Sequence, residues 1–122
     1  MQQKKKLLLV DDDARNLFAL TKFLRKRHYE IEVAPNGVRA LEMLPMGNYD
    51  ALLTDIMMPE IDGYMLIRRI RDLGYLDIPI IAITAKAMQG DEEACLQAGA
   101  NAYLAKPVDI DDLTVLLKKI GL

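Results

Sequence analysis

The chain has few of the residues that usually mark redox or acid-base chemistry: it contains one cysteine, Cys95, and one histidine, His28. A single cysteine excludes a disulfide within the chain, and we expect Cys95 to be a small apolar residue on a helix. His28 closes the basic run at residues 25–28. Because cations favour the end of a helix and no acid-base partner lies nearby in the sequence, we expect a solvated helix end there.

Long apolar runs are also missing. The basic residues 4–6 are followed by only four apolar residues before Asp11, too few for a signal-peptide core or a membrane span. A net charge of −2 gives no overall basic field, which argues against direct contact with nucleic acid. We therefore expect one cytoplasmic domain over residues 1–122 with no membrane contact.

Short apolar segments make up much of the chain instead. With 52% hydrophobic and 28% charged residues, a chain of this length can bury the core of one domain. Helical patterning follows each apolar segment; in the last one, Leu113, Leu116 and Leu117 lie on one helix face. This alternation favours an α/β fold with helices on both faces of a parallel sheet. The predicted strands are residues 6–10, 30–34, 51–54, 79–84 and 101–105.

The predicted strands differ in composition, which suggests their order. Residues 7–10, 51–54 and 80–84 are continuous apolar runs, as in strands covered on both faces, whereas residues 30–33 alternate and residues 101–106 are mixed. The second and fifth strands are therefore expected at the edges. The order 2-1-3-4-5 has these edges and is that of a flavodoxin-like doubly wound sheet, in which ligands bind beyond the carboxyl ends of the strands.

Polar residues stand at the ends of four of these strands or directly after them: Asp11 and Asp12, Asp55, Thr84 and Lys106. Two carboxylates about 4 Å apart repel by roughly 4 kcal/mol at an effective dielectric of about 20, so a cluster away from water needs a cation or a proton. Mg²⁺ suits this set, because it takes one or two carboxylates and completes its shell with water and phosphate oxygens. Lys106 would then neutralise a bound phosphate, and Thr84 would donate a hydrogen bond to it.

The stretch LLLVDDDARN at residues 7–16 has a simpler interpretation as well. One Asp can cap the helix that follows, and further acid is favoured near a helix N-terminus. A cap needs only one acid. The whole set of strand-end residues therefore favours Asp11 and Asp12 as metal-binding residues and Asp13 as the cap.

The strand-end residues and the motifs around them, in their order and spacing, resemble the receiver domain of two-component response regulators over nearly the whole chain. The matching features are the acid pair in LLLVDD, Asp55-Ile56-Met57-Met58-Pro59 followed by Asp62-Gly63, Thr84-Ala85, and Lys106-Pro107. The segments DDDARNLFAL and TAKAMQGDEEACLQAGA are similar to receivers attached to hybrid histidine kinases. Both a free-standing regulator and a receiver within a longer chain fit this resemblance.

The resemblance implies a switch that is controlled by phosphorylation. Asp55 would accept a phosphoryl group from a phosphohistidine of a sensor histidine kinase or a histidine phosphotransfer protein. Mg²⁺ would be bound by Asp12, Asp55 and the Met57 backbone carbonyl, with Asp11 acting through water. Lys106 and Thr84 would contact the acyl phosphate.

The resemblance also implies how phosphorylation would change the binding of a downstream partner. Tyr103 would change rotamer together with Thr84, and a downstream effector would bind the face formed by the fourth helix, the fifth strand and the fifth helix. Phosphorylation would be able to dimerise the domain. The Lys106-Pro107 peptide bond would be cis, and Met57 and Lys86 would tune the lifetime of the phosphate.

Two other functions use similar residues. A Mg²⁺-dependent phosphohydrolase of the haloacid dehalogenase type also has an Asp nucleophile, but its motif has Thr or Val where this sequence has Arg15, and the chain lacks the length for a cap domain. A degenerate receiver that only docks partners would lack some site residues, and here all of them are present.

The remaining polar clusters have structural explanations. We expect Arg68, Arg69 and Arg71 on the solvated face of a helix. The acids at residues 109, 111 and 112 should cap the last helix, because the glycine and closing glutamate of a Ca²⁺ loop are missing. We expect Met58 in the core and residues 87–98 to form a helix with little apolar anchoring.

Overall fold

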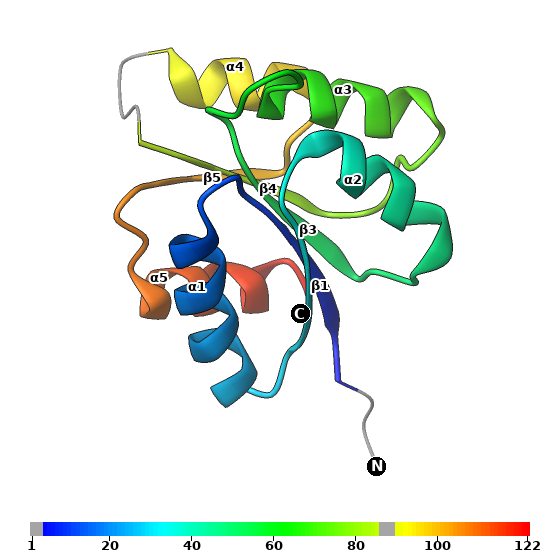
Figure 1. Ribbon diagram of the computed structural model, residues 1–122. Coiled ribbons are helices and arrows are strands. Elements are labelled where there is room, and N and C mark those ends of the chain that lie inside the picture. The colour runs from blue at the N-terminus through cyan, green and yellow to red at the C-terminus, as the bar shows by residue number, and fades with distance from the viewer. Residues whose placement is uncertain (1–3, 86–89) are drawn as a thin grey trace.

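The computed structural model describes residues 4–85 and 90–122, which form one parallel sheet with helices on both faces (Figure 1). The strand order β2-β1-β3-β4-β5 confirms the predicted order. Strand boundaries differ from the predicted ones by one residue at most: β3 includes Asp55, and β4 and β5 each begin one residue later. The strands are β1 (Lys6–Val10), β2 (Glu30–Ala34), β3 (Ala51–Asp55), β4 (Ile80–Thr84) and β5 (Ala102–Ala105).

The helices divide into two layers (Figure 1). One buried cluster combines side chains of α1 and α5 with one face of the sheet, and the other combines side chains of α2, α3 and α4 with the opposite face. These helices are α1 (Ala14–Lys26), α2 (Gly37–Met43), α3 (Gly63–Asp72), α4 (Asp91–Ala98) and α5 (Ile110–Lys119), and the short 3-10 helix η1 (Leu44–Met46) follows α2.

Burial distinguishes the central strands from the edge strands, as predicted. All residues of β3 and β4 are buried, because helices cover both of their faces. Strand β2 has exposed residues among buried ones, and β5 is partly exposed throughout.

Aspartates begin three of the helices. The Asp13 side chain accepts a hydrogen bond from the Arg15 N–H, Asp62 accepts from the Met65 N–H, and Asp109 accepts from the N–H groups of Asp111 and Asp112. These contacts confirm Asp13 and Asp109 as caps, since each satisfies N–H groups that have no partner within the helix.

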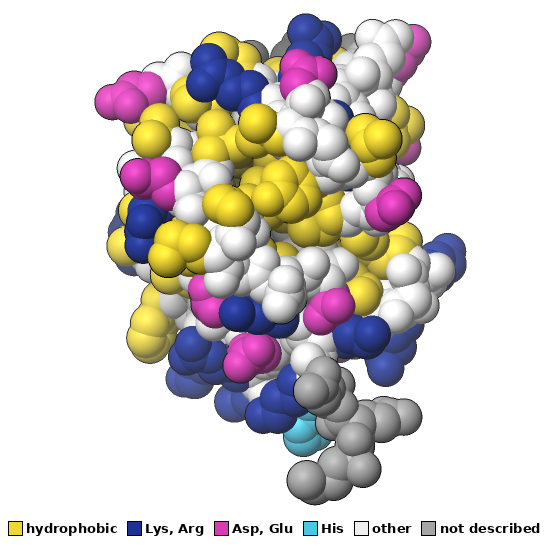
Figure 2. Space-filling model, turned by 90° about the vertical axis from the view of Figure 1, so that its right-hand side faces the viewer, with side chains coloured by type: hydrophobic (Ala, Val, Ile, Leu, Met, Phe, Trp, Pro, Cys, Tyr) yellow, Lys and Arg dark blue, Asp and Glu magenta, His cyan; other side chains and the backbone are white. Residues whose placement is uncertain are grey.

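Several other predictions about single residues are confirmed. Met58 and Cys95 are buried, and Cys95 lies on α4. The histidine, cyan in Figure 2, lies exposed just beyond the basic end of α1. Helix α4 buries only Cys95 and Ala98 among its residues, which fits the light anchoring expected there. Lys86 and the predicted first turn at residues 87–89 lie outside the described residues.

Arg71 corrects the prediction that it lies on a solvated helix face; Arg68 and Arg69 are exposed as expected. Its guanidinium bonds to backbone carbonyls at 2.8–3.0 Å and thereby joins the end of α3 to the loops that precede β4 and β5. The planar fork of arginine suits several acceptors at once. The acceptors are the carbonyls of Gly99, Tyr75 and Ile78 and the Asn101 side chain.

None of the helices within residues 4–85 and 90–122 combines the length and the apolar character needed to cross a membrane.

The Arg71 contacts predict a large stability effect at this position. Arg71→Met leaves carbonyl groups without their charged donor and should lower the free energy of unfolding by about 2 to 4 kcal/mol. Arg69→Met removes an exposed arginine from the same helix and should change the free energy of unfolding by less than about 0.5 kcal/mol. Urea denaturation of both variants measures the difference, and equal losses would contradict this role of Arg71.

Candidate functional site

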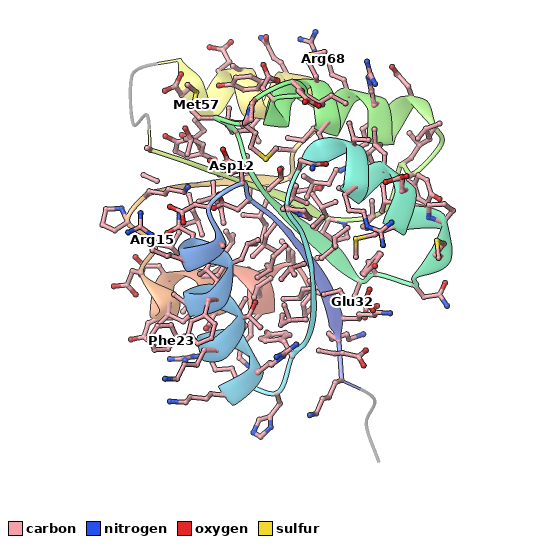
Figure 3. The ribbon with its side chains drawn as sticks, viewed as in Figure 1. Asp12, Arg15, Phe23, Glu32, Met57 and Arg68 are labelled. Atoms are coloured by element: carbon pink, nitrogen blue, oxygen red, sulfur yellow. The ribbon has the colours of Figure 1, made fainter. Side chains whose placement is uncertain are left out.

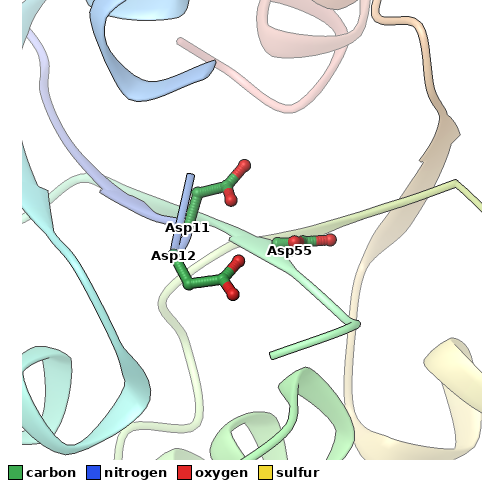
Figure 4. Close-up of side chains that lie close together, drawn as sticks. All are labelled: Asp11, Asp12 and Asp55. Atoms are coloured by element: carbon green, nitrogen blue, oxygen red, sulfur yellow. The ribbon is translucent and has the colours of Figure 1, made fainter. Parts of the chain in front are cut away.

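Three carboxylates meet at the carboxyl ends of β1 and β3 (Figure 4). Asp11 and Asp12 follow β1, Asp55 ends β3, and the two strands are neighbours in the sheet. One oxygen from each carboxylate lies within 4.8 Å of the others. The predicted acidic cluster is therefore assembled by the parallel pairing of two strands.

The three acids differ in their contact with water. Asp11 and Asp55 are only 5% and 6% exposed, whereas Asp12 is exposed. Burial raises the pKa of Asp55, and the nearby Asp11 carboxylate raises it further; the Lys106 ammonium and the Met57 N–H oppose this shift. The site therefore concentrates negative charge where water solvates it poorly.

Lys106 supplies the balancing cation. Its Nζ lies 3.4 Å from Asp11 Oδ2 and 3.3 Å from Asp55 Oδ2. Burial alone would lower the pKa of Lys106, but the Asp11 and Asp55 carboxylates outweigh that effect and the pKa is raised. Lys106 therefore remains an ammonium in the cluster. The Lys106-Pro107 peptide bond is cis, as predicted.

The donor set fits Mg²⁺. Oδ1 of Asp55 is buried and has no hydrogen-bond partner among the described residues, so this carboxylate has an oxygen free for a ligand. The Asp12 carboxylate is also accessible to a ligand, because it is exposed. Hard carboxylate oxygens with access to water on one side are the ligands that Mg²⁺ prefers. Met57, which Figure 3 labels, lies two residues beyond Asp55 in the chain.

The turn after β3 holds Asp55 in place through close backbone packing. The Gly63 N–H donates to the Ile56 carbonyl at 2.9 Å, and the Thr54 hydroxyl donates to the Asp55 carbonyl at 2.9 Å. A Cβ on Gly63 would collide with the Asp55 carbonyl oxygen. The glycine in Asp62-Gly63 is therefore required so that α3 can begin directly against the backbone of Asp55.

Thr84 and Tyr103 lie on neighbouring strands beside this cluster. Thr84 ends β4 and is buried, and its carbonyl accepts a hydrogen bond from the Lys106 N–H at 2.8 Å. Tyr103 on β5 is partly buried and packs against the core cluster beneath α3 and α4. The structure therefore brings the predicted residues Thr84 and Lys106 to one edge. Tyr103 lies two residues before Ala105, the residue that pairs with Thr84.

Two features of the site were not predicted from the sequence. The Asn16 amide on α1 donates to Asp11 Oδ2 at 3.4 Å. A groove of 740 Å³ also extends from Asp11 and Lys106 between α1 and the loop after β5. Its walls include Leu20, Phe23 and Val108. Phe23 marks its α1 side in Figure 3. The only sequence signal for this groove is that Leu20 and Phe23 lie on one side of the first helix.

Comparison with known proteins gives the same assignment for most of the chain. Residues 7–118 match the family described as response regulator receiver domain. The sensor histidine kinase RcsC of Escherichia coli is 40% identical over 105 residues, which cover 86% of this chain and 11% of that protein. The response regulator MprA of Mycobacterium ulcerans is 37% identical over 115 residues, which cover 94% of this chain and 49% of that protein. This chain thus spans half or less of these relatives.

A solved structure is similar over almost its full length. It is the receiver domain of a sensor histidine kinase from Pseudomonas aeruginosa with a magnesium ion coordinated in the active site cleft. It is 40% identical in sequence, the TM-score is 0.87, and the match covers 98% of this chain and 99% of the other.

The packing at Gly63 predicts the effect of a single added methyl group. Gly63→Ala forces Cβ against the Asp55 backbone and should lower the free energy of unfolding by about 2 to 3 kcal/mol. Gly37→Ala is the control, because Gly37 is also the first residue of a helix and the atoms nearest to its Cβ would be Ile61 side-chain atoms at 3.2 Å. Thermal unfolding followed by circular dichroism compares the two, and a loss at Gly37 as large as that at Gly63 would contradict the requirement.

Proposed function

The chain belongs to the response regulator receiver domain family, and on this premise we propose that it switches partner binding when a phosphohistidine protein phosphorylates Asp55. Phosphorylation-dependent switching is the general function of receiver domains in two-component signalling. One observation carries the assignment to Asp55: it is the buried strand-end carboxylate that contacts Lys106 and keeps one oxygen without a hydrogen-bond partner among the described residues. We treat residues 1–122 as a single receiver domain.

The proposed reaction transfers a phosphoryl group between two side chains. An Asp55 carboxylate oxygen forms a bond to phosphorus as the P–N bond of the phosphohistidine breaks, and that electron pair returns to the imidazole nitrogen. The Lys106 ammonium, already 3.3 Å from Asp55, pairs with a phosphoryl oxygen, and the Thr84 hydroxyl donates to another. Bound Mg²⁺ supplies positive charge that offsets the carboxylate and phosphoryl groups.

Mg²⁺ is proposed to bind Asp12, Asp55 and the Met57 backbone carbonyl, with Asp11 acting through a water molecule. The burial of Asp11 and its contacts with Lys106 and Asn16 favour this outer position, because its oxygens already have partners. The Asp12 carboxylate is exposed and is therefore better placed as a direct ligand.

The groove between α1 and the loop after β5 is proposed as the side from which the donor approaches. This groove opens at Lys106, and its apolar residues Leu20, Phe23 and Val108 offer contacts to a partner. The donor is a sensor histidine kinase or a histidine phosphotransfer protein. No observation favours a phosphohydrolase, because the family to which the chain belongs consists of signalling domains.

The output is proposed to depend on Thr84 and Tyr103. A phosphoryl group on Asp55 attracts the Thr84 hydroxyl, and its movement leaves space for the Tyr103 ring on the next strand. The face formed by α4, β5 and α5 would then change for a downstream effector or for a second phosphorylated copy. Met57 would influence the phosphate lifetime through its position beside the site.

Phosphorylation should depend on Asp55 alone. Acetyl phosphate with Mg²⁺ should add one phosphoryl group to the wild-type chain, and Asp55→Asn should abolish the addition because it removes the nucleophile. Intact mass measurement at neutral pH detects the product. Asp72→Asn changes an exposed acid on α3 and should react like the wild type; equal labelling of Asp55→Asn would refute the assignment.

Metal binding should distinguish the neighbouring acids. Asp12→Ala removes a direct ligand and should weaken Mg²⁺ binding by about tenfold or more, whereas Asp13→Ala should leave binding intact and cost about 1 kcal/mol of stability through the lost cap. Calorimetric Mg²⁺ titration and urea denaturation give the two quantities. Loss of binding in Asp13→Ala with normal binding in Asp12→Ala would show that the acid pair is shifted by one residue.

Switching should be visible at Tyr103. In protein labelled with 3-fluorotyrosine, beryllofluoride and Mg²⁺ should shift the Tyr103 ¹⁹F signal, which Tyr103→Phe identifies by its disappearance. Thr84→Ala should reduce that shift, because the ring follows the hydroxyl. An unchanged Tyr103 signal in the wild type, under conditions where Mg²⁺ and beryllofluoride bind, would exclude this route.

A further inference from the structure

The outer edge of β2 offers backbone groups that no other strand of the sheet uses. The Glu30 N–H and the Ala34 carbonyl point toward β1, because they bond to the Lys5 carbonyl and the Asp11 N–H. Backbone groups alternate in direction along a strand, so those of Ile31 and Val33 point away from the sheet. Because β2 is the edge strand, these groups have no partner strand in the described chain.

Apolar side chains lie exposed beside this edge. A groove of 570 Å³ runs along it, with α1 residues on one side and β2 residues on the other. Phe18 of α1 is 72% exposed and Val33 of β2 is 42% exposed, and both line the groove. An exposed edge strand flanked by apolar side chains favours pairing with another strand.

We propose that two copies of this chain pair antiparallel along their β2 edges, with Val33 facing the partner's Val33. In antiparallel pairing, facing residues of this kind exchange both N–H···O bonds. The contact would join the two sheets into one and bring Phe18 of each copy over the paired valines. This proposal goes beyond the phosphorylation switch, since it requires neither metal nor phosphate.

The hydrogen-bonding groups favour this register. With Val33 at the centre, Ile31 faces the partner's Pro35, which has no N–H to donate. The Ile31 carbonyl does not need that donor, because it already accepts a hydrogen bond from Arg25 Nη2 at 3.3 Å. The Ile31 N–H has no partner among the described residues and is available to the partner's Pro35 carbonyl. The chain bends at Pro35 and Asn36, so the paired segment ends there.

The charges on the opposite face of β2 favour the same register. Glu32 would face the partner's Ala34, so no two carboxylates oppose each other there. A shift that centred the pairing on Glu32 would place two like charges across the axis, which destabilises strand pairs. Glu32 is also neutralised within its own copy, because Lys6 Nζ lies 2.7 Å from it and the Tyr49 hydroxyl donates to it at 2.7 Å.

Sedimentation velocity of the full chain without Mg²⁺ tests this dimer. The interface is small, so we expect dimer to appear between about 10 and 500 µM. Val33→Lys places two ammonium groups at the axis and should leave only monomer, and Phe18→Ser should raise the dissociation constant by about tenfold. Val115→Lys, the same change at an exposed valine of α5, should dimerise like the wild type.

A disulfide provides a second measurement that does not depend on the strength of the dimer. Val33→Cys should form a linked dimer under mild oxidation, because facing strand residues lie within disulfide distance, whereas Val115→Cys should not. The native Cys95 is buried and should not compete. A monomeric wild type over the whole concentration range, dimer retained in Val33→Lys, or equal linkage at both positions would overturn the proposal.

Discussion

The contact of Lys106 with two buried carboxylates is the interaction on which the site depends. Asp11 and Asp55 lose most of their water when β1 and β3 pair, and each would repel the other without a cation. Lys106 comes from the far edge strand and reaches both. The five-stranded sheet must therefore be complete from β1 to β5 before the cluster is electrostatically balanced.

The rest of the fold fixes the strands that carry these charges. Gly63 allows α3 to begin against the Asp55 backbone, and Arg71 at the other end of α3 fastens the loops that lead into β4 and β5. Thr84 and Lys106 thus reach the site from strands whose starting points are tied to the same helix. This common anchoring supports the proposal that a phosphoryl group on Asp55 acts on neighbouring strands while the sheet itself remains in place.

The strand-end residues and the sheet order could be predicted, because buried strands are continuous apolar runs and parallel strands end at the same edge. Asp13 and Asp109 were predictable as caps for a local reason: their hydrogen bonds reach only two or three residues along the chain. Arg71 was not, since its acceptor at Gly99 is 28 residues away and its sequence neighbours, Arg68 and Arg69, are solvated. Long-range contacts of flexible side chains leave no periodic signal in the sequence. The β2 edge leaves none either, because the direction of single backbone groups decides which N–H and carbonyl groups can bind a partner.

The stability of Lys106→Met as a function of Mg²⁺ concentration tests the central electrostatic claim most directly. Methionine keeps the length of the side chain and removes its charge. The account predicts that without Mg²⁺ the variant has a lower free energy of unfolding than the wild type, and that saturating Mg²⁺ restores more stability to the variant than it adds to the wild type, because the ion replaces the lost cation. The account would be contradicted by a variant that is as stable as the wild type without Mg²⁺ and that gains no more stability than the wild type when Mg²⁺ is added.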